Sequence, residues 1–285
     1  MTKPNPSSPP RLTASQEFAF ERLCATARLQ FSRPDYGPVK LRTTPLVLGP
    51  SGVGKTHLIQ AVAKELGLPL MRLTVSNWMI EGVRLDTPTV VRLRREVERG
   101  RPFVLQIDEL DKLKASDEAW CRAQQAEVYN VLDRMPGLVT AEGTTGTSNL
   151  WRQEQIEFLT HQVFMIGCGT WQEVFEANSP AKGQLGFWCG PSPKSPDAEL
   201  QAKVRQARMI APELLNRFSN DWIFLRGYSR EDFAQLARDL HLPPTILDPI
   251  EAENSGLNYR YLENVLTKAA VDSMIPYRAP RNPAP

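Results

Sequence analysis

Short apolar runs alternate with amphipathic stretches along most of the chain. Apolar residues dominate five short segments, at residues 46–48, 69–75, 103–107, 163–166 and 222–225. Runs of this length predict strands that are buried on both faces. Between them, apolar positions recur at helical spacing, as in residues 86–99 and 118–135, and a further helix is predicted from Thr13 to just before Pro34. Strands that alternate with helices predict an α/β fold with a five-stranded parallel sheet covered on both faces.

The pattern changes near the end of the chain. From Ser229 onward only helical patterns remain, and residues 1–10 and 276–285 are both rich in proline. Proline-rich ends are typical of disordered or extended segments. We therefore expect a large α/β domain at residues 11–227 and a small all-helical lid domain at residues 228–275, between two extended tails.

Composition narrows the class of protein. The 285 residues are 41% hydrophobic and 23% charged, as in soluble globular proteins, and the net charge of +2 is too small to indicate nucleic acid by itself. The four cysteines form no CxxC pair, which favours buried thiols in a reducing compartment. Without a membrane-length apolar run or a signal peptide, the sequence predicts a cytoplasmic protein with no membrane partner.

A glycine-rich turn joins the first predicted strand to a helix. The segment Gly49-Pro50-Ser51-Gly52-Val53-Gly54-Lys55-Thr56-His57 fits the pattern GxxxxGK[ST] in full. Its glycines tolerate positive φ and let backbone N–H groups surround phosphate oxygens, and the following helix offers a positive dipole end. Lys55 would reach the β and γ phosphates, and the Thr56 hydroxyl would bind Mg²⁺. The turn therefore predicts ATP binding.

Two carboxylates end the third predicted strand. Asp108 and Glu109 close the run FVLQIDE, about 50 residues after the phosphate loop. A carboxylate at this strand end can bind Mg²⁺, directly or through water, and the next can orient or deprotonate an attacking water. We expect Asp108 to serve the metal and Glu109 to activate water.

The stretch IDELDKL resembles the AAA+ ATPases, and within them the unfoldase subunits of the Clp and Hsl proteases. Residues 164–171 resemble the strand that carries the family's sensor-1 polar residue, which is Thr170, or Cys168 in a shifted alignment. Residues 212–218 resemble the arginine-finger box, with Arg217 as the finger. Residues 256–264 resemble the sensor-2 segment, with Arg260 in that role.

The resemblance implies an AAA+ module, in which a P-loop α/β domain with a five-stranded parallel sheet is followed by a small helical lid. It implies catalytic roles for Lys55, Asp108, Glu109, Thr170, Arg217 and Arg260, with ATP and Mg²⁺ as cofactors. A finger supplied by a neighbouring subunit makes hydrolysis depend on assembly, so a homo-oligomeric ring or spiral is expected, with a hexamer as the expected form.

The substrate is less clearly indicated by the sequence. Residues 75–84 stand where unfoldases carry an aromatic gripping loop, yet Glu81 occupies the aromatic position, leaving Trp78 either to grip from another offset or to pack in the interior. Arg84, Arg92, Arg94, Arg95 and Arg99 form a basic segment that is a solvated face or holds a phosphate backbone. Residues 137–161 are expected to form a second mobile loop facing the channel.

Three functions follow from these features. The leading interpretation is an ATPase that remodels a protein substrate or complex. One alternative is a DNA-associated ATPase of replication, transposition or defence against mobile DNA. The other is a switch that assembles on binding ATP and hydrolyses it slowly.

Overall fold

A computed structural model describes residues 12–33, 41–80, 87–113, 118–136 and 151–172, then 175, 196–206, 210–220, 222–226, 228, 232, 234, 235, 264 and 267. The chain divides into two compact units, residues 1–50 with 55–225 and residues 51–54 with 226–285. The secondary structure given below belongs to the first unit. Arg260, both tails and most of residues 228–275 lie outside the described residues.

The first unit is built on a parallel sheet. Its strands are β1 (Leu46–Leu48), β2 (Leu70–Thr74), β3 (Phe103–Asp108), β4 (Val163–Gly169) and β5 (Trp222–Phe224). They lie side by side in the order β2-β3-β4-β1-β5, and each neighbouring pair runs parallel. The five-stranded parallel sheet predicted from the apolar runs is therefore confirmed, with β2 and β5 at its edges.

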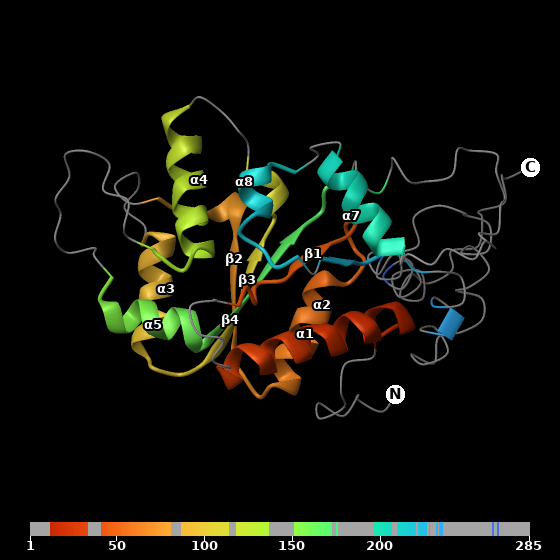
Figure 1. Ribbon diagram of the computed structural model, residues 1–285, viewed down its shortest axis with the longest axis horizontal. Helices are drawn as coiled ribbons and strands as arrows, with labels where there is room; N and C mark the ends of the chain where they lie inside the picture. The colour runs from red at the N-terminus through yellow and green to blue at the C-terminus, as the bar shows by residue number, and fades with distance from the viewer. Residues whose placement is uncertain are drawn as a thin grey trace, which may run out of the picture. The chain divides into compact units, whose positions relative to one another are not determined.

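Helices cover both faces of this sheet (Figure 1). The elements are α1 (Ala14–Ser32), α2 (Lys55–Glu65), α3 (Thr89–Glu98), α4 (Ala119–Leu132), α5 (Gln153–His161), α7 (Pro196–Gln206) and α8 (Pro212–Leu215), with short turns η1 (Val75–Asn77) and η2 (Leu110–Lys112). In Figure 1, α3, α4 and α5 lie on one side of the strands and α1 and α2 on the other.

Strand alternation explains the two layers. Phe103, Leu105 and Ile107 of β3 belong to one apolar cluster with the buried residues of α3, α4 and α5. Successive side chains on a strand point to opposite faces, so Val104 and Gln106 belong to the other face, and both are buried. Helix α2 contacts β3, and α1 packs on α2. Helix α2, which begins at Lys55, therefore covers the face of the sheet to which the even positions of β3 belong.

Local signals set the helix ends. Helix α1 begins after Thr13, whose backbone N–H donates to the Gln16 side chain at 3.1 Å, and it ends at Arg33 in the left-handed region (φ 46°). Gly67 follows α2 with φ 65°, a conformation that glycine adopts without a steric penalty. The bounds of α1 agree with the helix predicted from Thr13 to just before Pro34.

Strand β4 is longer than predicted. The predicted strand ends at Ile166, whereas β4 continues to Gly169. A Cβ on Gly167 would lie 2.3 Å from Cε1 of Phe218, and one on Gly169 would lie 2.1 Å from Cζ3 of Trp171. These glycines admit aromatic rings against the strand rather than ending it.

Of the expectations about the channel loops, one is wrong in its described part, and the two alternatives for Trp78 are now distinguished. The expected mobile loop at 137–161 includes α5, where Leu159 is fully buried and the Arg152 N–H donates to the Gln155 side chain at 2.8 Å. Apolar residues at helical spacing in 156–159 outweighed the polar composition of this segment; residues 137–150 lie outside the described part. Trp78 is 2% exposed and its Nε1 donates to Glu127 at 2.8 Å, so it packs in the interior and cannot grip a substrate.

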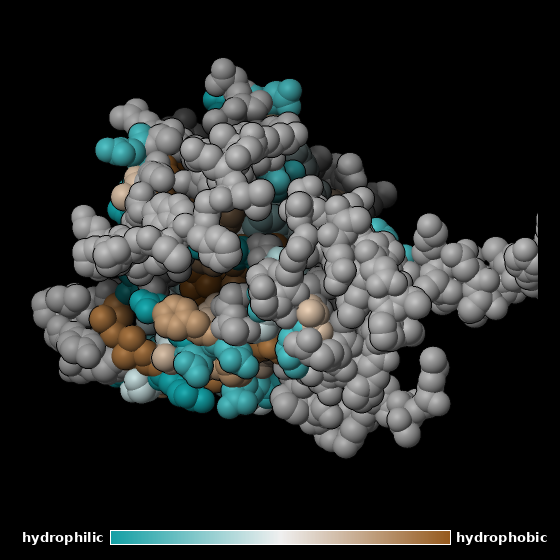
Figure 2. Space-filling model, turned by 90° about the vertical axis from the view of Figure 1, so that its right-hand side faces the viewer, coloured by the Kyte–Doolittle hydropathy of each residue, from teal (hydrophilic) through white to brown (hydrophobic). Residues whose placement is uncertain are grey.

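The described surface mixes apolar and hydrophilic side chains. On the face shown in Figure 2, brown apolar atoms lie directly beside teal hydrophilic ones. The large exposed hydrophobic residues of the described part are Phe18, Leu29, Leu41, Trp120 and Met135. None of its helices combines the length and apolarity that crossing a membrane requires.

Candidate functional site

The phosphate loop occupies the turn between β1 and α2. Gly52 and Gly54 have φ values of 83° and 87°, which only glycine adopts at little cost. Gly49 donates its backbone N–H to the carbonyl of Gly169 at 3.3 Å, which joins the start of the loop to the end of β4. The positive φ values are those that the glycine pattern predicted for a loop with inward N–H groups.

Lys55 opens helix α2. Its ammonium donates to the backbone carbonyls of Gly49 at 2.5 Å and Pro50 at 2.8 Å. Thr56 beside it is half-buried and His57 is exposed. The lysine charge is thus held at the first residues of the loop, by acceptors that phosphate oxygens can replace.

Asp108 ends β3 with its side chain 9% exposed. Its Oδ2 accepts from an Arg72 guanidinium nitrogen at 2.5 Å and from Gln106 Nε2 at 3.2 Å. Its Oδ1 accepts the backbone N–H of Glu109 at 2.9 Å. These three donors fix the orientation of a carboxylate that is almost fully buried.

Glu109 follows the strand in the left-handed region, with φ 60° and ψ 36°. This conformation costs a non-glycine residue about 1 kcal/mol or more. It ends the strand and turns the chain directly into η2. The Ser76 hydroxyl donates to Oε2 of Glu109, so η1 and the end of β3 meet at this side chain.

Thr170 and Cys168, the alternative sensor-1 residues, differ in their surroundings. Thr170 is half-buried just beyond β4, and its backbone N–H donates to Asp111 Oδ1 at 2.9 Å. Cys168 is fully buried, and its thiol lies 3.9 Å from Gln106 Nε2. Burial, with a smaller contribution from the charge of Asp108, raises the pKa of the Cys168 thiol far above its usual range, so this thiol stays protonated.

Arg217 lies against α4 of its own chain. Its Nε donates to Asp133 Oδ2 at 3.0 Å, its guanidinium carbon lies 4.0 Å from the Tyr129 ring centroid, and it also donates to the Glu213 carbonyl. The Arg217 side chain is 22% exposed. The structure therefore brings Asp108 and Glu109 together and places Arg217 with α4; Arg260 is outside the described residues.

Three polar residues beside the carboxylates were missed by sequence reasoning. Arg72, Ser76 and Gln106 all contact Asp108 or Glu109. A signal existed for two of them, because Arg72 interrupts the apolar run of β2 and Gln106 interrupts that of β3. A polar residue inside a buried strand requires a partner, and here the partner is a site carboxylate.

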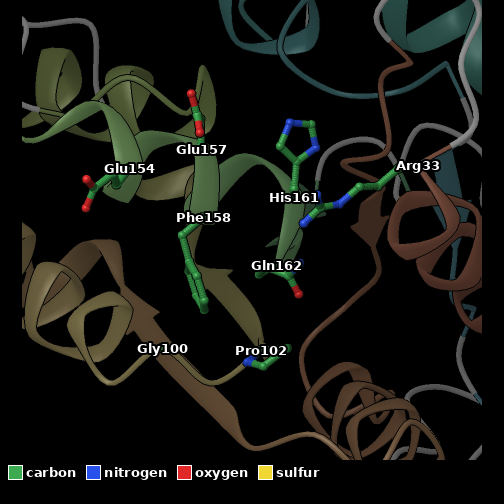
Figure 3. Close-up of a pocket in the computed structure, with 8 residues that line it drawn as sticks. All are labelled: Arg33, Gly100, Pro102, Glu154, Glu157, Phe158, His161 and Gln162. Atoms are coloured by element: carbon green, nitrogen blue, oxygen red, sulfur yellow. The ribbon is translucent and has the colours of Figure 1, made fainter.

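A separate pocket of about 430 Å³ lies near the amino ends of β3 and β4, between Pro102 and Gln162 (Figure 3). Arg33 and His161 lie close together in this view, while Glu154 and Glu157 extend from α5. In a parallel sheet the amino ends of the strands lie opposite to their carboxyl ends, where β3 ends in Asp108 and β1 leads into the phosphate loop. The pocket is therefore distinct from the phosphate-binding site.

The donor set suits magnesium held partly by phosphate. Asp108 and Thr56 offer carboxylate and hydroxyl oxygens, which Mg²⁺ prefers. Within the described residues, no group of three or more His, Cys, Asp or Glu side chains is arranged to hold a metal ion. Mg²⁺ commonly takes one or two protein ligands and completes its shell with water and substrate phosphates, so these residues fit the metal.

Comparison with known proteins agrees with this site. The model of the family described as "ATPase family associated with various cellular activities (AAA)" matches residues 45–173. An uncharacterized AAA family ATPase, y4kL of Sinorhizobium fredii, is 40% identical over 95 residues, which are 33% of this chain and 28% of that protein.

Two further relatives are named ATP-dependent zinc metalloprotease FtsH. The protein of Acidimicrobium ferrooxidans is 32% identical over 102 residues, covering 34% of this chain and 16% of its own length. That of Pirellula staleyi is 37% identical over 105 residues, covering 37% and 15%. The chain thus spans well under a third of these relatives, and FtsH represents a different AAA+ branch from Clp and Hsl. Residues 45–173, which carry the phosphate loop and both carboxylates, are thus the part of the chain that is similar to the AAA ATPase family and to a protein named as an AAA family ATPase.

Proposed function

We propose that this chain hydrolyses ATP at interfaces shared between subunits of a homo-oligomeric ring or spiral, and uses the energy to remodel a protein substrate or complex. The observation that carries the proposal is the pair Asp108 and Glu109, fixed by hydrogen bonds where β3 ends. The remaining roles follow from the residues around this pair.

Residues 49–57 would hold the triphosphate. Backbone N–H groups would surround the phosphates, and the Lys55 ammonium would exchange its carbonyl acceptors for β and γ oxygens. Thr56 and Asp108 would hold Mg²⁺, which when bound neutralises charge on the phosphates. Lys55 and Thr56 lie on α2, and Asp108 lies on β3.

Glu109 would orient the attacking water. To do so, its carboxylate must face the γ-phosphate rather than the Ser76 hydroxyl that it accepts from. Thr170, just beyond the neighbouring strand β4, would sense the γ-phosphate through its hydroxyl. The burial of the protonated Cys168 thiol supports Thr170 over Cys168 in this role. Arg260, which lies outside the described residues, would act as the sensor-2 arginine that its segment resembles, within the proposed lid domain at residues 228–275.

Arg217 would act in a neighbouring subunit's site. A guanidinium fork stabilises charge on the equatorial oxygens during phosphoryl transfer. Within its own chain Arg217 binds Asp133 and stacks on Tyr129, so assembly would have to replace these contacts. A finger given from one copy to the next requires head-to-tail contacts, which close into a ring, here proposed as a hexamer, or continue as a spiral.

A protein substrate is supported by the relatives. Those named FtsH are called ATP-dependent metalloproteases, and such proteins act on polypeptides. The Clp-like order of motifs after residue 173 supports the same class, and a cytoplasmic location remains part of the proposal. Because Trp78 is buried, it is not proposed to grip such a substrate.

A DNA substrate is the second candidate, and one observation favours it. Helix α3 exposes Arg92, Arg95 and Arg99, and an arginine-rich face in a ring can hold a phosphate backbone. Against this, Arg99 pairs with Glu96 at 2.7 Å and Arg94 lies 3.8 Å from Glu98. These acids reduce the positive potential of the helix.

Steady-state ATP hydrolysis tests both candidates. Turnover is measured for the protein alone, with single-stranded DNA, with double-stranded DNA and with an unfolded protein. We expect the unfolded protein, and neither form of DNA, to increase the rate of ATP hydrolysis. Stimulation only by DNA would overturn the protein-remodelling proposal in favour of the DNA-associated one, and the absence of hydrolysis under every condition would contradict the ATPase function.

A further inference from the structure

We propose that Arg72 is a positioning residue that occupies the metal-binding face of Asp108 and must be displaced when magnesium and nucleotide bind. The inference rests on the proposed role of Asp108 as a metal ligand. It assigns a residue of the edge strand β2 to the control of metal loading.

Strand register brings Arg72 to this carboxylate. Strands β2 and β3 pair so that Arg72 lies opposite Gln106 and Thr74 opposite Asp108. Alternate residues of a strand share a face, so Arg72, Gln106 and Asp108 lie on the face that α1 and α2 cover. The Arg72 side chain is 46% exposed at the sheet edge, whereas that of Asp108 is 9% exposed. The arginine thus reaches inward from the edge to a nearly buried acid.

The hydrogen bonds are concentrated on one oxygen. Oδ2 of Asp108 accepts from Arg72 at 2.5 Å and from Gln106 at 3.2 Å, and Oδ1 accepts only the Glu109 N–H among the bonds described. A carboxylate offers about four acceptor positions, so three are used. A metal ion or a metal-bound water approaching Oδ2 therefore meets the guanidinium.

Charge makes the two cations exclude each other. A guanidinium bound at 2.5 Å to one carboxylate oxygen would lie next to a divalent ion on the same group, and like charges at this distance repel. The partial exposure of Arg72 gives it a route out, because its charge can return to water at the sheet edge. An exchange of cations at Asp108 follows, rather than simultaneous binding.

Gln106 is suited to keep the carboxylate oriented during this exchange. It is fully buried, it is neutral, and its Nε2 donates to the same Oδ2. Its Oε1 has no hydrogen-bond partner among the described residues. Because the Gln106 amide is neutral, it can keep the Asp108 carboxylate oriented without repelling a metal ion that binds there.

The test measures the magnesium dependence of nucleotide binding in the full chain. A fluorescent, non-hydrolysable ATP analogue is titrated at increasing Mg²⁺ in the unmodified protein and in Arg72→Gln. Partly exposed ion pairs correspond to an equilibrium factor of up to about fivefold, so half-saturating Mg²⁺ should fall about three- to fivefold in Arg72→Gln. Arg72→Lys, which keeps the charge, should stay within about twofold of the unmodified protein.

Thermal unfolding gives a second readout. Without nucleotide, Arg72→Gln should melt at a lower temperature than the unmodified protein, because Asp108 loses its cation. With Mg²⁺ and the analogue the difference should narrow, since the metal takes the same place. Arg28→Gln is the matched control: Arg28 pairs with Glu65 at 3.7 Å on the surface, with both side chains more than half exposed. It should change neither quantity.

Three results would overturn the inference. Unchanged or increased half-saturating Mg²⁺ in Arg72→Gln, with nucleotide binding intact, would show that Arg72 does not compete with the metal. If Arg72→Gln does not fold, the same measurement is made on Arg72→Met, which keeps the aliphatic stem. A melting difference that persists with Mg²⁺ and analogue would assign Arg72 a purely structural role. Failure of the unmodified protein to bind the analogue would instead contradict the proposed ATPase function, and the inference with it.

Discussion

Arg134 is a half-buried residue whose guanidinium hydrogen-bonds to several segments of the fold, and its removal should destabilise the domain strongly. Its Nη1 donates to the carbonyls of Leu159, Thr160 and Val163, and its Nη2 to Gln30 Oε1 and Thr44 Oγ1, at 2.8 to 3.3 Å. One guanidinium therefore links the end of α5 and the start of β4 to α1 and the segment before β1. Arg134→Met keeps most of the apolar volume and deletes every one of these bonds.

The magnitude follows from the acceptors left behind. Val163 O keeps a bond from Gln30 Nε2 at 2.6 Å and Gln30 Oε1 keeps one from the Thr43 hydroxyl at 2.8 Å, whereas the acceptors on Leu159, Thr160 and Thr44 lose the Arg134 donor in partly buried positions. At about 1 kcal/mol for each lost bond, and more for bonds to a charged donor, the free energy of unfolding should fall by about 3–5 kcal/mol. For a domain of this size the melting temperature should then fall by roughly 10 °C.

Chemical unfolding in urea, followed by circular dichroism, measures this loss. Arg122→Met is the matched control, because Arg122 is exposed on α4, and it should change the free energy of unfolding by less than about 0.5 kcal/mol. A loss below about 1 kcal/mol in Arg134→Met would refute the reasoning, since it would mean that the network contributes no more than a surface contact.

The pH dependence gives an independent check on Arg134. Burial lowers the pKa of Arg134 to about 10 from its ordinary 12.5. The unfolded chain keeps the ordinary pKa, so it binds more protons than the folded chain only above about pH 10. Arg134 therefore makes the free energy of unfolding rise with pH only in that range. Between about pH 6 and 9 the arginine is charged in both states. The loss in Arg134→Met should therefore be constant across that range, and a loss that varies steeply within it would contradict this assignment.

Further predictions concern the site. Lys55→Ala should lose ATP binding, because its charge-assisted contact with the phosphates disappears, and near-normal affinity by fluorescence titration would remove the phosphate loop assignment. The raised pKa of Cys168 and its burial predict that iodoacetamide at about pH 8 labels the half-buried Cys121 in the folded protein, and labels Cys168 only after unfolding. Mass spectrometry that finds both cysteines labelled at equal rates in the folded protein would contradict this. Arg217→Ala subunits should be nearly inactive alone because a finger contributes about 10³-fold or more, and Glu109→Gln subunits because they lack the group that orients water. When the two are mixed, activity should return, because an Arg217→Ala subunit keeps its own Glu109 and can receive Arg217 from a Glu109→Gln neighbour. No recovery in confirmed mixed assemblies would exclude a finger shared between subunits.

The sheet and the position of the site were predictable because their signals are local. Parallel strands buried on both faces require continuous apolar runs, and the carboxyl ends of such strands all lie at the same end of the sheet. The glycine pattern and Asp108 could therefore be assigned to the same edge from the order of the strands and loops along the chain. The helix α5 was missed because its polar residues hid the apolar spacing of Ile156 and Leu159.

The contacts of the site were not predictable in the same way. Whether Arg72 reaches Asp108 depends on the register between β2 and β3, which no pattern within either strand fixes. The burial of Trp78 depends likewise on Glu127, a residue far along the chain that accepts its indole N–H. Partners so distant in sequence follow only from the assembled sheet and its helices.

Glu109→Gln tests the central claim most directly, because it separates binding from hydrolysis at a single atom. Radiolabelled ATP is incubated with the unmodified protein and with Glu109→Gln, and bound nucleotide and released phosphate are measured from the same samples. Removing the group that orients water leaves the phosphate contacts intact, so Glu109→Gln should retain bound ATP and release phosphate at least about 100-fold more slowly. Hydrolysis at the unmodified rate, or loss of ATP binding in a folded Glu109→Gln protein, would contradict the assignment of this residue and of the site built around it.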